Sequence, residues 1–283
     1  MQIKKVGVIG CGIMGGGIAQ VCAQSGYDVI ASEINEELLN KGLAAINANL
    51  SRNVEKEKMT QQEKDATLGR LKGTTSMQDF SDRDLVIEAV VENMDLKKKL
   101  FTDLDKICPP NAILATNTSC LSIIDMATQT SRPDKVLGLH FMNPVPVMKL
   151  IEIVRTIATS DETLEAGKEF GQTLNKTIVI AQDAPGFIVN RLMVPYLNNA
   201  IRMLESKVAT REDIDTGINL GLAHPMGPLA LSDLVGLDTL YFITNSIYEE
   251  FKDPQYAAPV LLGKMVKMGW LGRKTGKGFY DYK

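Results

Sequence analysis

The first two thirds of the chain alternate short apolar runs with longer segments in which apolar residues recur at helical spacing. The short runs are bounded by polar residues or glycine and predict β-strands, whereas the longer segments predict amphipathic α-helices. The predicted strands are Lys5–Ile9, Asp28–Ser32, Asp84–Val90, Ala112–Thr116, Lys135–Leu139, Leu150–Val154 and Thr177–Ala181. The predicted helices are Met14–Ser25, Glu36–Lys58, Gln61–Leu71, Asp95–Lys106 and Asp161–Leu174. Strands that alternate with helices indicate an α/β domain with a Rossmann-like, doubly wound, mostly parallel sheet.

The last part of the chain carries helical spacing without an alternating strand pattern. Its predicted helices are Phe187–Leu204, Arg211–Leu220, Leu229–Phe251 and Pro259–Met268. Thr210 and Asp213 are spaced as a capping box before the second of these. A Pro-Gly pair at 185–186 favours a boundary near Asp183. We therefore expect an α/β domain over 1–183 and a helical domain over 184–283.

Composition then excludes several classes of protein. Of 283 residues, 45% are hydrophobic and 23% are charged, which is typical of a globular chain with a sizeable core. The net charge of -3 gives no reason to expect a nucleic-acid partner or an anionic membrane surface. No apolar run approaches the length of a membrane helix, and the N-terminus has no secretory apolar region. Cysteine spacing fits no metal site, so buried reduced thiols and a cytoplasmic location are expected.

A glycine-rich turn follows the first predicted strand. Gly10, Gly12 and Gly15 form G-x-G-x-x-G between that strand and the next helix. This arrangement permits a tight turn, close approach of the backbone to a pyrophosphate, and close packing of helix on strand. Glu33 comes directly after the predicted strand Asp28–Ser32, where its carboxylate can accept hydrogen bonds from a ribose and would repel a 2′-phosphate. The segment predicts a site for NAD in preference to NADP, while a glycine turn without ligand remains the simpler alternative.

The chain has two histidines, and one of them is placed for chemistry. His140 directly follows the predicted strand Lys135–Leu139, and the turn at Asn143–Pro146 precedes another strand. Folding the chain back about Pro146 sets Glu152 opposite His140. A buried carboxylate facing an imidazole fixes its tautomer and stabilises its charged form, as a general base for alcohol oxidation requires. A purely structural pair is the alternative, and His224 is expected to be a turn or interface residue.

Other polar segments of the sequence are candidates for ligand contacts. Asn117, Thr118 and Ser119 follow a strand at the edge where open α/β sheets bind ligands. Asn190 lies in the first turn of a helix near the domain junction, where an amide serves either a substrate or a helix cap. The basic stretch Gly263–Lys283 is either a solvated surface or a contact for a phosphate-bearing ligand.

Taken together, these motifs resemble the short-chain L-3-hydroxyacyl-CoA dehydrogenases, and among them the bacterial members that act on 3-hydroxybutyryl-CoA. The motifs are G-C-G-I-M-G at 10–15, V-V-E-N at 90–93, N-T-S at 117–119, H-F-M-N-P-V-P-V-M-K-L-I-E at 140–152, D-A-P-G-F-I-V-N-R-L at 183–192, H-P-M-G-P at 224–228 and K-T-G-K-G-F-Y at 274–280. The resemblance spans the whole chain. It implies NAD-dependent interconversion of (S)-3-hydroxybutyryl-CoA and acetoacetyl-CoA, in butyrate-type fermentation or fatty acid oxidation, by a homodimer.

The resemblance also implies roles for individual residues. His140 corresponds to the catalytic base and Glu152 to the acid that orients it, while Ser119 and Asn190 correspond to residues that hydrogen-bond the acyl-CoA thioester substrate. The implied cofactor contacts are Gly10, Gly12, Ile13, Met14, Gly15, Glu33, Glu92, Lys97, Ser119, Asn143 and Lys274. Ser51 and Lys56 fall in a CoA-contacting region. No metal is implied, and Glu33 stands where an aspartate is more usual.

Two rival functions remain open at this point. A β-hydroxyacid dehydrogenase acting on free carboxylates also has a glycine-rich turn of this kind, but uses a lysine as its acid or base. A non-catalytic NAD-binding protein would bind the cofactor without transferring hydride. Activity on free 3-hydroxybutyrate equal to that on its CoA thioester would favour the first rival. Tight NAD binding without hydride transfer would favour the second.

Overall fold

The computed structural model describes residues 2–282, which divide into two compact units between Ala184 and Pro185. The strands are β1 (Lys5–Ile9), β2 (Asp28–Ser32), β3 (Leu71–Thr74), β4 (Leu85–Glu88), β5 (Ile113–Thr116), β6 (Val136–Phe141), β7 (Leu150–Arg155) and β8 (Thr177–Gln182). The helices of the first unit are α1 (Ile13–Gln24), α2 (Glu36–Glu55), α3 (Gln61–Gly69), α4 (Met94–Ile107), α5 (Ile123–Ala127) and α6 (Asp161–Thr173). The second unit holds α7 (Val189–Glu205), α8 (Arg211–Gly221), α9 (Pro228–Val235), α10 (Leu237–Phe251) and α11 (Val260–Lys267).

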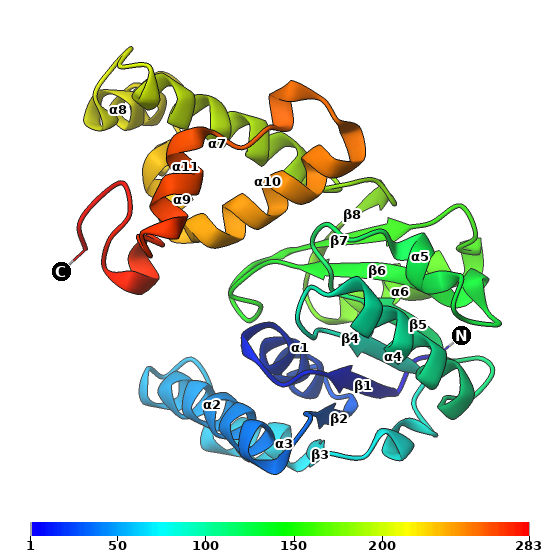
Figure 1. Ribbon diagram of the computed structural model, residues 1–283. Helices are drawn as coiled ribbons and strands as arrows, with labels where there is room; N and C mark the ends of the chain where they lie inside the picture. The colour runs from blue at the N-terminus through cyan, green and yellow to red at the C-terminus, as the bar shows by residue number, and fades with distance from the viewer. Residues whose placement is uncertain (1, 283) are drawn as a thin grey trace. The chain divides into compact units, whose positions relative to one another are not determined.

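Within the described residues of the first unit, all strands join one eight-stranded sheet in the order β3-β2-β1-β4-β5-β6-β7-β8 (Figure 1). Every neighbouring pair is parallel except β6 and β7, which run antiparallel. The order reverses direction at β1 and β4, so the carboxyl ends of these strands form the edge where open α/β sheets bind ligands. The predicted Rossmann-like α/β class, followed by a helical part, is confirmed.

The two faces of the sheet are covered by different helices. Leu137 and Leu139 of β6 belong to a hydrophobic cluster that includes residues of α1, α2 and α6. The residue between them, Gly138, faces the other way, because a Cβ there would lie 2.5 Å from Ile123 of α5. Successive side chains of a strand alternate between faces. Alternate residues of β6 therefore face α6 and α5.

The same alternation places a row of polar residues on the α5 face. The neighbours Ile87, Ala115, Leu139 and Ile153 all belong to the cluster on the opposite face. The residue next to each of these along its strand is polar and so points to the α5 face. These polar residues are Glu88 on β4, Thr116 on β5, His140 on β6 and Glu152 on β7. The sheet thus brings polar side chains from adjacent strands to one face, near one edge.

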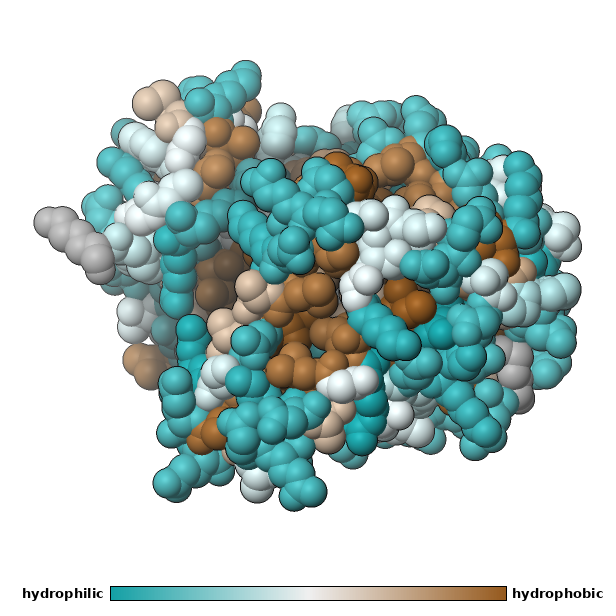
Figure 2. All heavy atoms as spheres, turned by 90° about the horizontal axis from the view of Figure 1, so that it is seen from below, coloured by the Kyte–Doolittle hydropathy of each residue, from teal (hydrophilic) through white to brown (hydrophobic). Residues whose placement is uncertain are grey.

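The second unit is helical, and several of its apolar side chains reach solvent. Its large exposed apolar residues include Leu192, Leu220, Leu222, Leu234 and Val260. Figure 2 views the whole molecule from below Figure 1 and shows hydrophobic groups gathered among hydrophilic ones on that face. None of the helices in the described part of the chain has both the length and the hydrophobicity that crossing a bilayer requires.

The structure corrects three sequence predictions. The single helix predicted over Leu229–Phe251 is wrong: α9 and α10 are separate, because Gly236 adopts a positive φ of 96°. The helix predicted to end at Leu71 ends earlier, and Leu71 begins β3, an edge strand that the prediction missed. His140 lies inside β6 and not after it, since that strand continues to Phe141.

Candidate active site

The glycine-rich turn connects β1 to α1 and meets the steric demands predicted from the sequence. Gly10 has φ of 90°, a conformation that favours glycine. A Cβ on Gly15 would overlap the carbonyl oxygen of Gly10, so this position must be glycine for the helix to pack on the turn. A Cβ on Gly12 would meet nothing within 4 Å. Gly12 therefore lies beside open space, as a residue that admits a ligand must.

Replacing Gly15 by alanine should destabilise the protein by about 1–3 kcal/mol or more, because the added methyl group overlaps backbone that cannot rotate away. Thermal denaturation measures the change. Gly69→Ala is the matched control, since a Cβ at Gly69 meets nothing within 4 Å. Equal melting temperatures for the two variants would contradict this account of the turn.

A pocket of about 470 Å³ adjoins the turn, and Glu33 lies in its wall. It is lined by Cys11, Gly12, Ile13, Gly16, Gly17, Gln20, Glu33, Leu38, Lys41, Gly42, Ala45, Ile46, Asn49, Asn143, Pro144, Val145 and Pro146. Glu33 follows β2, and its Oε1 accepts a hydrogen bond from the Cys11 backbone N–H at 2.8 Å. This bond fixes the carboxylate beside the turn. Burial, followed by the charge of Glu33, raises the pKa of the Cys11 thiol to about 11, so the thiol stays protonated and unreactive.

These features fit a dinucleotide. The open space at Gly12 and the N-terminus of α1 suit a pyrophosphate, because unpaired N–H groups and the helix dipole favour negative charge there. The fixed carboxylate of Glu33 suits ribose hydroxyls. Asn143 of the β6–β7 turn lines the same pocket, while the side chain of Ile13 is exposed beside it.

His140 and Glu152 face each other across β6 and β7. The predicted register is observed, with His140 paired to Glu152. His140 Nδ1 lies 2.6 Å from Glu152 Oε2, and the two side chains are 8% and 0% exposed. A carboxylate on Nδ1 selects the tautomer in which Nε2 is the proton acceptor. The pair has the geometry of a general base with its orienting acid.

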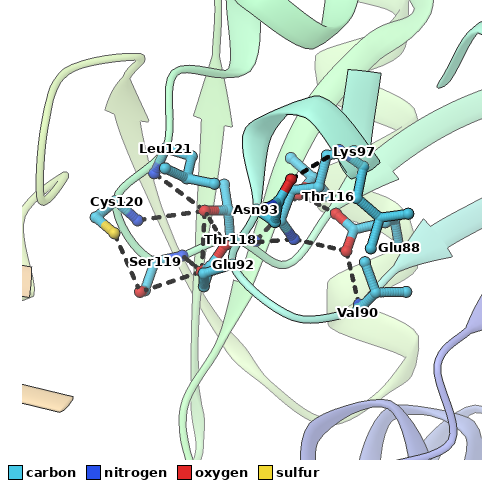
Figure 3. Close-up of polar contacts among 11 residues, drawn as sticks. Glu88, Val90, Glu92, Asn93, Lys97, Thr116, Thr118, Ser119, Cys120 and Leu121 are labelled. Carbon is cyan, nitrogen blue, oxygen red and sulfur yellow. Dashed lines mark hydrogen bonds and ion pairs between the residues drawn. The ribbon is translucent and has the colours of Figure 1, made fainter. Parts of the chain in front are cut away.

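Ser119, Glu92 and Lys97 are linked to one another in the first unit (Figure 3). Glu92 accepts hydrogen bonds from the Ser119 backbone N–H at 2.9 Å and from the Thr118 hydroxyl at 3.0 Å. Lys97 Nζ lies 3.3 Å from Glu92 Oε2, and its side chain is only 1% exposed. Glu92 thus ties the loop after β5 to helix α4, and Lys97 acts on this loop through Glu92.

The remaining predicted site residues are placed as follows. Ser51 of α2 accepts a hydrogen bond from Lys64 at 2.8 Å, and Lys56 is the C-cap residue of the same helix. Asn190 lies in the first turn of α7, and Lys274 is bonded to Asp238 at 2.6 Å, both in the second unit. The roles of these four residues with substrate or cofactor stay predictions. His224, which is predicted to be a turn or interface residue, lies 3.5 Å from the Tyr196 hydroxyl.

Sequence reasoning missed two buried polar residues beside this network. Glu88, the last residue of β4, is 0% exposed and bonds to Lys97, while Thr116, the last residue of β5, bonds to Glu88. The signal was present in the sequence. Glu88 ends the apolar run Leu85–Glu88, as Glu152 interrupts the run Leu150–Val154, and a carboxylate in such a run needs a partner.

Comparisons with known proteins match the chain to 3-hydroxyacyl-CoA dehydrogenases over nearly its whole length. A family model described as 3-hydroxyacyl-CoA dehydrogenase, NAD binding domain, matches residues 5–184, and its C-terminal domain counterpart matches residues 186–282. The 3-hydroxybutyryl-CoA dehydrogenase of Mycobacterium tuberculosis strain CDC 1551 is 50% identical over 282 residues, 99% of each chain.

Solved structures agree with these matches. The crystal structure of M. tuberculosis FadB2 superposes with a TM-score of 0.98 at 49% identity, covering 100% of both chains. That of the (S)-3-hydroxybutyryl-CoA dehydrogenase PaaH1 from Ralstonia eutropha has a TM-score of 0.96 at 45% identity, again covering 100% of both chains.

Proposed function

The chain belongs to the 3-hydroxyacyl-CoA dehydrogenase family, an oxidoreductase family with an NAD-binding domain, and from that premise we propose that it interconverts (S)-3-hydroxybutyryl-CoA and acetoacetyl-CoA. The observation that carries this proposal is the buried His140–Glu152 pair. It supplies the acid and base that a hydroxyl–ketone interconversion needs, at an edge of the sheet where ligands bind. NAD supplies the hydride acceptor for oxidation and, in its reduced form, the hydride donor for reduction.

The residues of the pair divide the proton chemistry between them. In oxidation, His140 Nε2 takes the proton of the 3-hydroxyl group as hydride leaves C3. Glu152 holds Nδ1–H and stabilises the imidazolium that forms, without becoming protonated itself. In reduction, the imidazolium returns the proton to the oxygen at C3. Oxidation and reduction therefore use the same His140–Glu152 pair, with the imidazole neutral at the start of oxidation and charged at the start of reduction.

Other residues of the chain bind and orient. We assign Glu92, Lys97, Asn143, Ser119 and Lys274 to the nicotinamide side of the cofactor. Gly10, Gly12, Ile13, Met14, Gly15 and Glu33 are assigned to its pyrophosphate and adenosine. Ser119 and Asn190 are assigned to the acyl group, and Ser51 and Lys56 to the CoA moiety. These assignments rest on matching sequence motifs, supported for Glu33 and Asn143 by their shared pocket.

The proposal also covers the roles of the two domains, the oligomeric state and the cellular location. The NAD-binding role goes to residues 1–183, and the substrate-binding and dimerisation roles to residues 184–283. The exposed apolar side chains of the second unit provide a surface that a homodimer would bury. A cytoplasmic enzyme of butyrate-type fermentation or fatty acid oxidation fits the substrate.

Initial rates test the function directly. The purified protein is assayed with acetoacetyl-CoA and longer 3-ketoacyl-CoAs, each with NADH and with NADPH, and with (S)-3-hydroxybutyryl-CoA and free 3-hydroxybutyrate in the oxidative direction. The proposal expects turnover of the CoA thioesters with NADH. Equal rates on free 3-hydroxybutyrate would favour a β-hydroxyacid dehydrogenase, and tight NAD binding without turnover would favour a non-catalytic protein.

Replacing Glu33 by alanine should move the ratio of NADH to NADPH affinities about 10- to 100-fold toward NADPH, because a charged hydrogen-bonding group is worth about 1.5–3 kcal/mol. The variant loses both the acceptor for ribose hydroxyls and the charge that repels a 2′-phosphate. Dissociation constants from fluorescence titration provide the measurement. Glu37→Gln is the control, since Glu37 is exposed and lies outside the pocket; an equal shift in both variants would refute the role of Glu33.

A further inference from the structure

Glu88 is a fully buried carboxylate to which the proposed mechanism gives no role. It is 0% exposed and ends β4 on the sheet face that carries His140. Its Oε1 accepts hydrogen bonds from Lys97 Nζ at 2.6 Å and from the Val90 backbone N–H at 2.7 Å. Its Oε2 accepts one from the Thr116 hydroxyl at 2.7 Å. A carboxylate with this many donors is held in one position.

Glu88 reaches the loop after β5 through two further charged side chains. Lys97 lies between Glu88 and Glu92 (Figure 3), and its Nζ is 2.6 Å from Glu88 Oε1 and 3.3 Å from Glu92 Oε2. Glu92 in turn accepts a hydrogen bond from the Ser119 backbone N–H at 2.9 Å. A buried ammonium needs a compensating charge, and Glu88 provides it from within the sheet. Lys97 can therefore hold the more exposed Glu92 in place.

The network also has a net charge. Glu88 and Glu92 are two carboxylates, and Lys97 is one ammonium, which together give −1. The oxidised nicotinamide ring is positively charged, whereas the reduced ring is neutral. A net negative group near that ring stabilises the oxidised form relative to the reduced one.

We propose that Glu88 is a positioning residue that fixes Lys97, Glu92 and hence the Ser119 loop, and that its charge sets the relative affinity for oxidised and reduced cofactor. This inference rests on the proposed function, which assigns Glu92 and Ser119 to the nicotinamide side. Glu88 acts through Lys97 and touches neither substrate nor cofactor.

The test compares Glu88→Gln with Glu88→Asp and a control. Glu88→Gln removes one negative charge at nearly constant size. It should raise the ratio of the NAD⁺ to the NADH dissociation constant about 3- to 10-fold, since the opposing charge near the ring is lost. It should also lower kcat/KM for acetoacetyl-CoA about 10- to 100-fold, because the Ser119 loop loses its support. Glu88→Asp keeps the charge and should keep the wild-type affinity ratio.

Asp105→Asn is the matched control. Asp105 forms a largely buried ion pair with Arg132 at 2.8 Å in the same unit, and its carboxylate also accepts hydrogen bonds from Ser131. Its replacement should destabilise the fold comparably while leaving the affinity ratio and kcat/KM near wild type. An affinity ratio in Glu88→Gln equal to that of the wild type and the control would overturn the proposal.

A second variant covers the case in which Glu88→Gln does not fold. The double variant Glu88→Gln/Lys97→Met leaves no lone charge in the buried pair, and only the charge of Glu92 remains, so the net charge stays at −1. Its affinity ratio should match the wild type, while kcat/KM falls because Glu92 loses its anchor. Wild-type kcat/KM in the double variant would also overturn the proposal. If the wild-type protein binds cofactor but turns over no thioester, the proposed function fails while the affinity ratio still decides the role of Glu88.

Discussion

Replacing His140 by glutamine should lower kcat by roughly 10²- to 10⁴-fold, the usual loss when a general base is removed. His140 is 7% exposed and lies 2.6 Å from Glu152, so the variant removes the proton acceptor and leaves the strands paired through backbone hydrogen bonds. Steady-state rates of acetoacetyl-CoA reduction measure the loss. Cofactor affinity should change little, because the glycine turn and Glu33 are untouched.

The second histidine of the chain provides the control. His224 contacts the hydroxyl and the ring of Tyr196, in the helical unit. His224→Gln should therefore retain nearly all of the wild-type kcat. Turnover by His140→Gln that equals that of His224→Gln would remove His140 from the mechanism.

Replacing Glu152 by glutamine should also reduce kcat by about 10²- to 10⁴-fold, since the neutral amide neither fixes the reactive tautomer nor stabilises the imidazolium. Glutamine has nearly the same size as glutamate, and Glu152 is fully buried, so packing is conserved. Reduction uses the charged form of His140 as its acid, and oxidation forms it. Both directions should therefore slow in the variant.

Comparing stability with turnover separates this role from a structural one. If Glu152 only joined β6 to β7, the variant would lose stability, but its folded fraction would keep a normal kcat. Circular dichroism and a thermal scan report on the fold, and the rate of acetoacetyl-CoA reduction reports on the chemistry. A normal kcat in folded Glu152→Gln would contradict the assignment of Glu152.

Much of the site could be predicted because it depends on local geometry. The turn around Pro146 fixes the register of β6 and β7, so residue numbers alone set Glu152 opposite His140. The glycine motif is also local, and the overlap expected at Gly15 follows from its position between strand and helix. In both cases the relevant contacts lie within one supersecondary unit.

Other features could not be predicted because they depend on distant contacts. The edge strand β3 has a single large apolar residue, Leu71, and becomes a strand by pairing with β2. The break at Gly236 follows from a positive φ that helical spacing does not reveal. The link from Glu88 to Ser119 crosses β4, α4 and the loop after β5, which only the folded sheet brings together.

The most direct test of the central claim is a single-turnover measurement with enzyme in excess over (S)-3-hydroxybutyryl-CoA and saturating NAD⁺. The appearance of NADH then reports hydride transfer without the contribution of product release. We expect rapid formation of one NADH per substrate by the wild-type protein, and formation slower by roughly 10²- to 10⁴-fold by His140→Gln with the cofactor still bound. Equal rates for the two proteins, or no NADH from the wild type, would contradict the account.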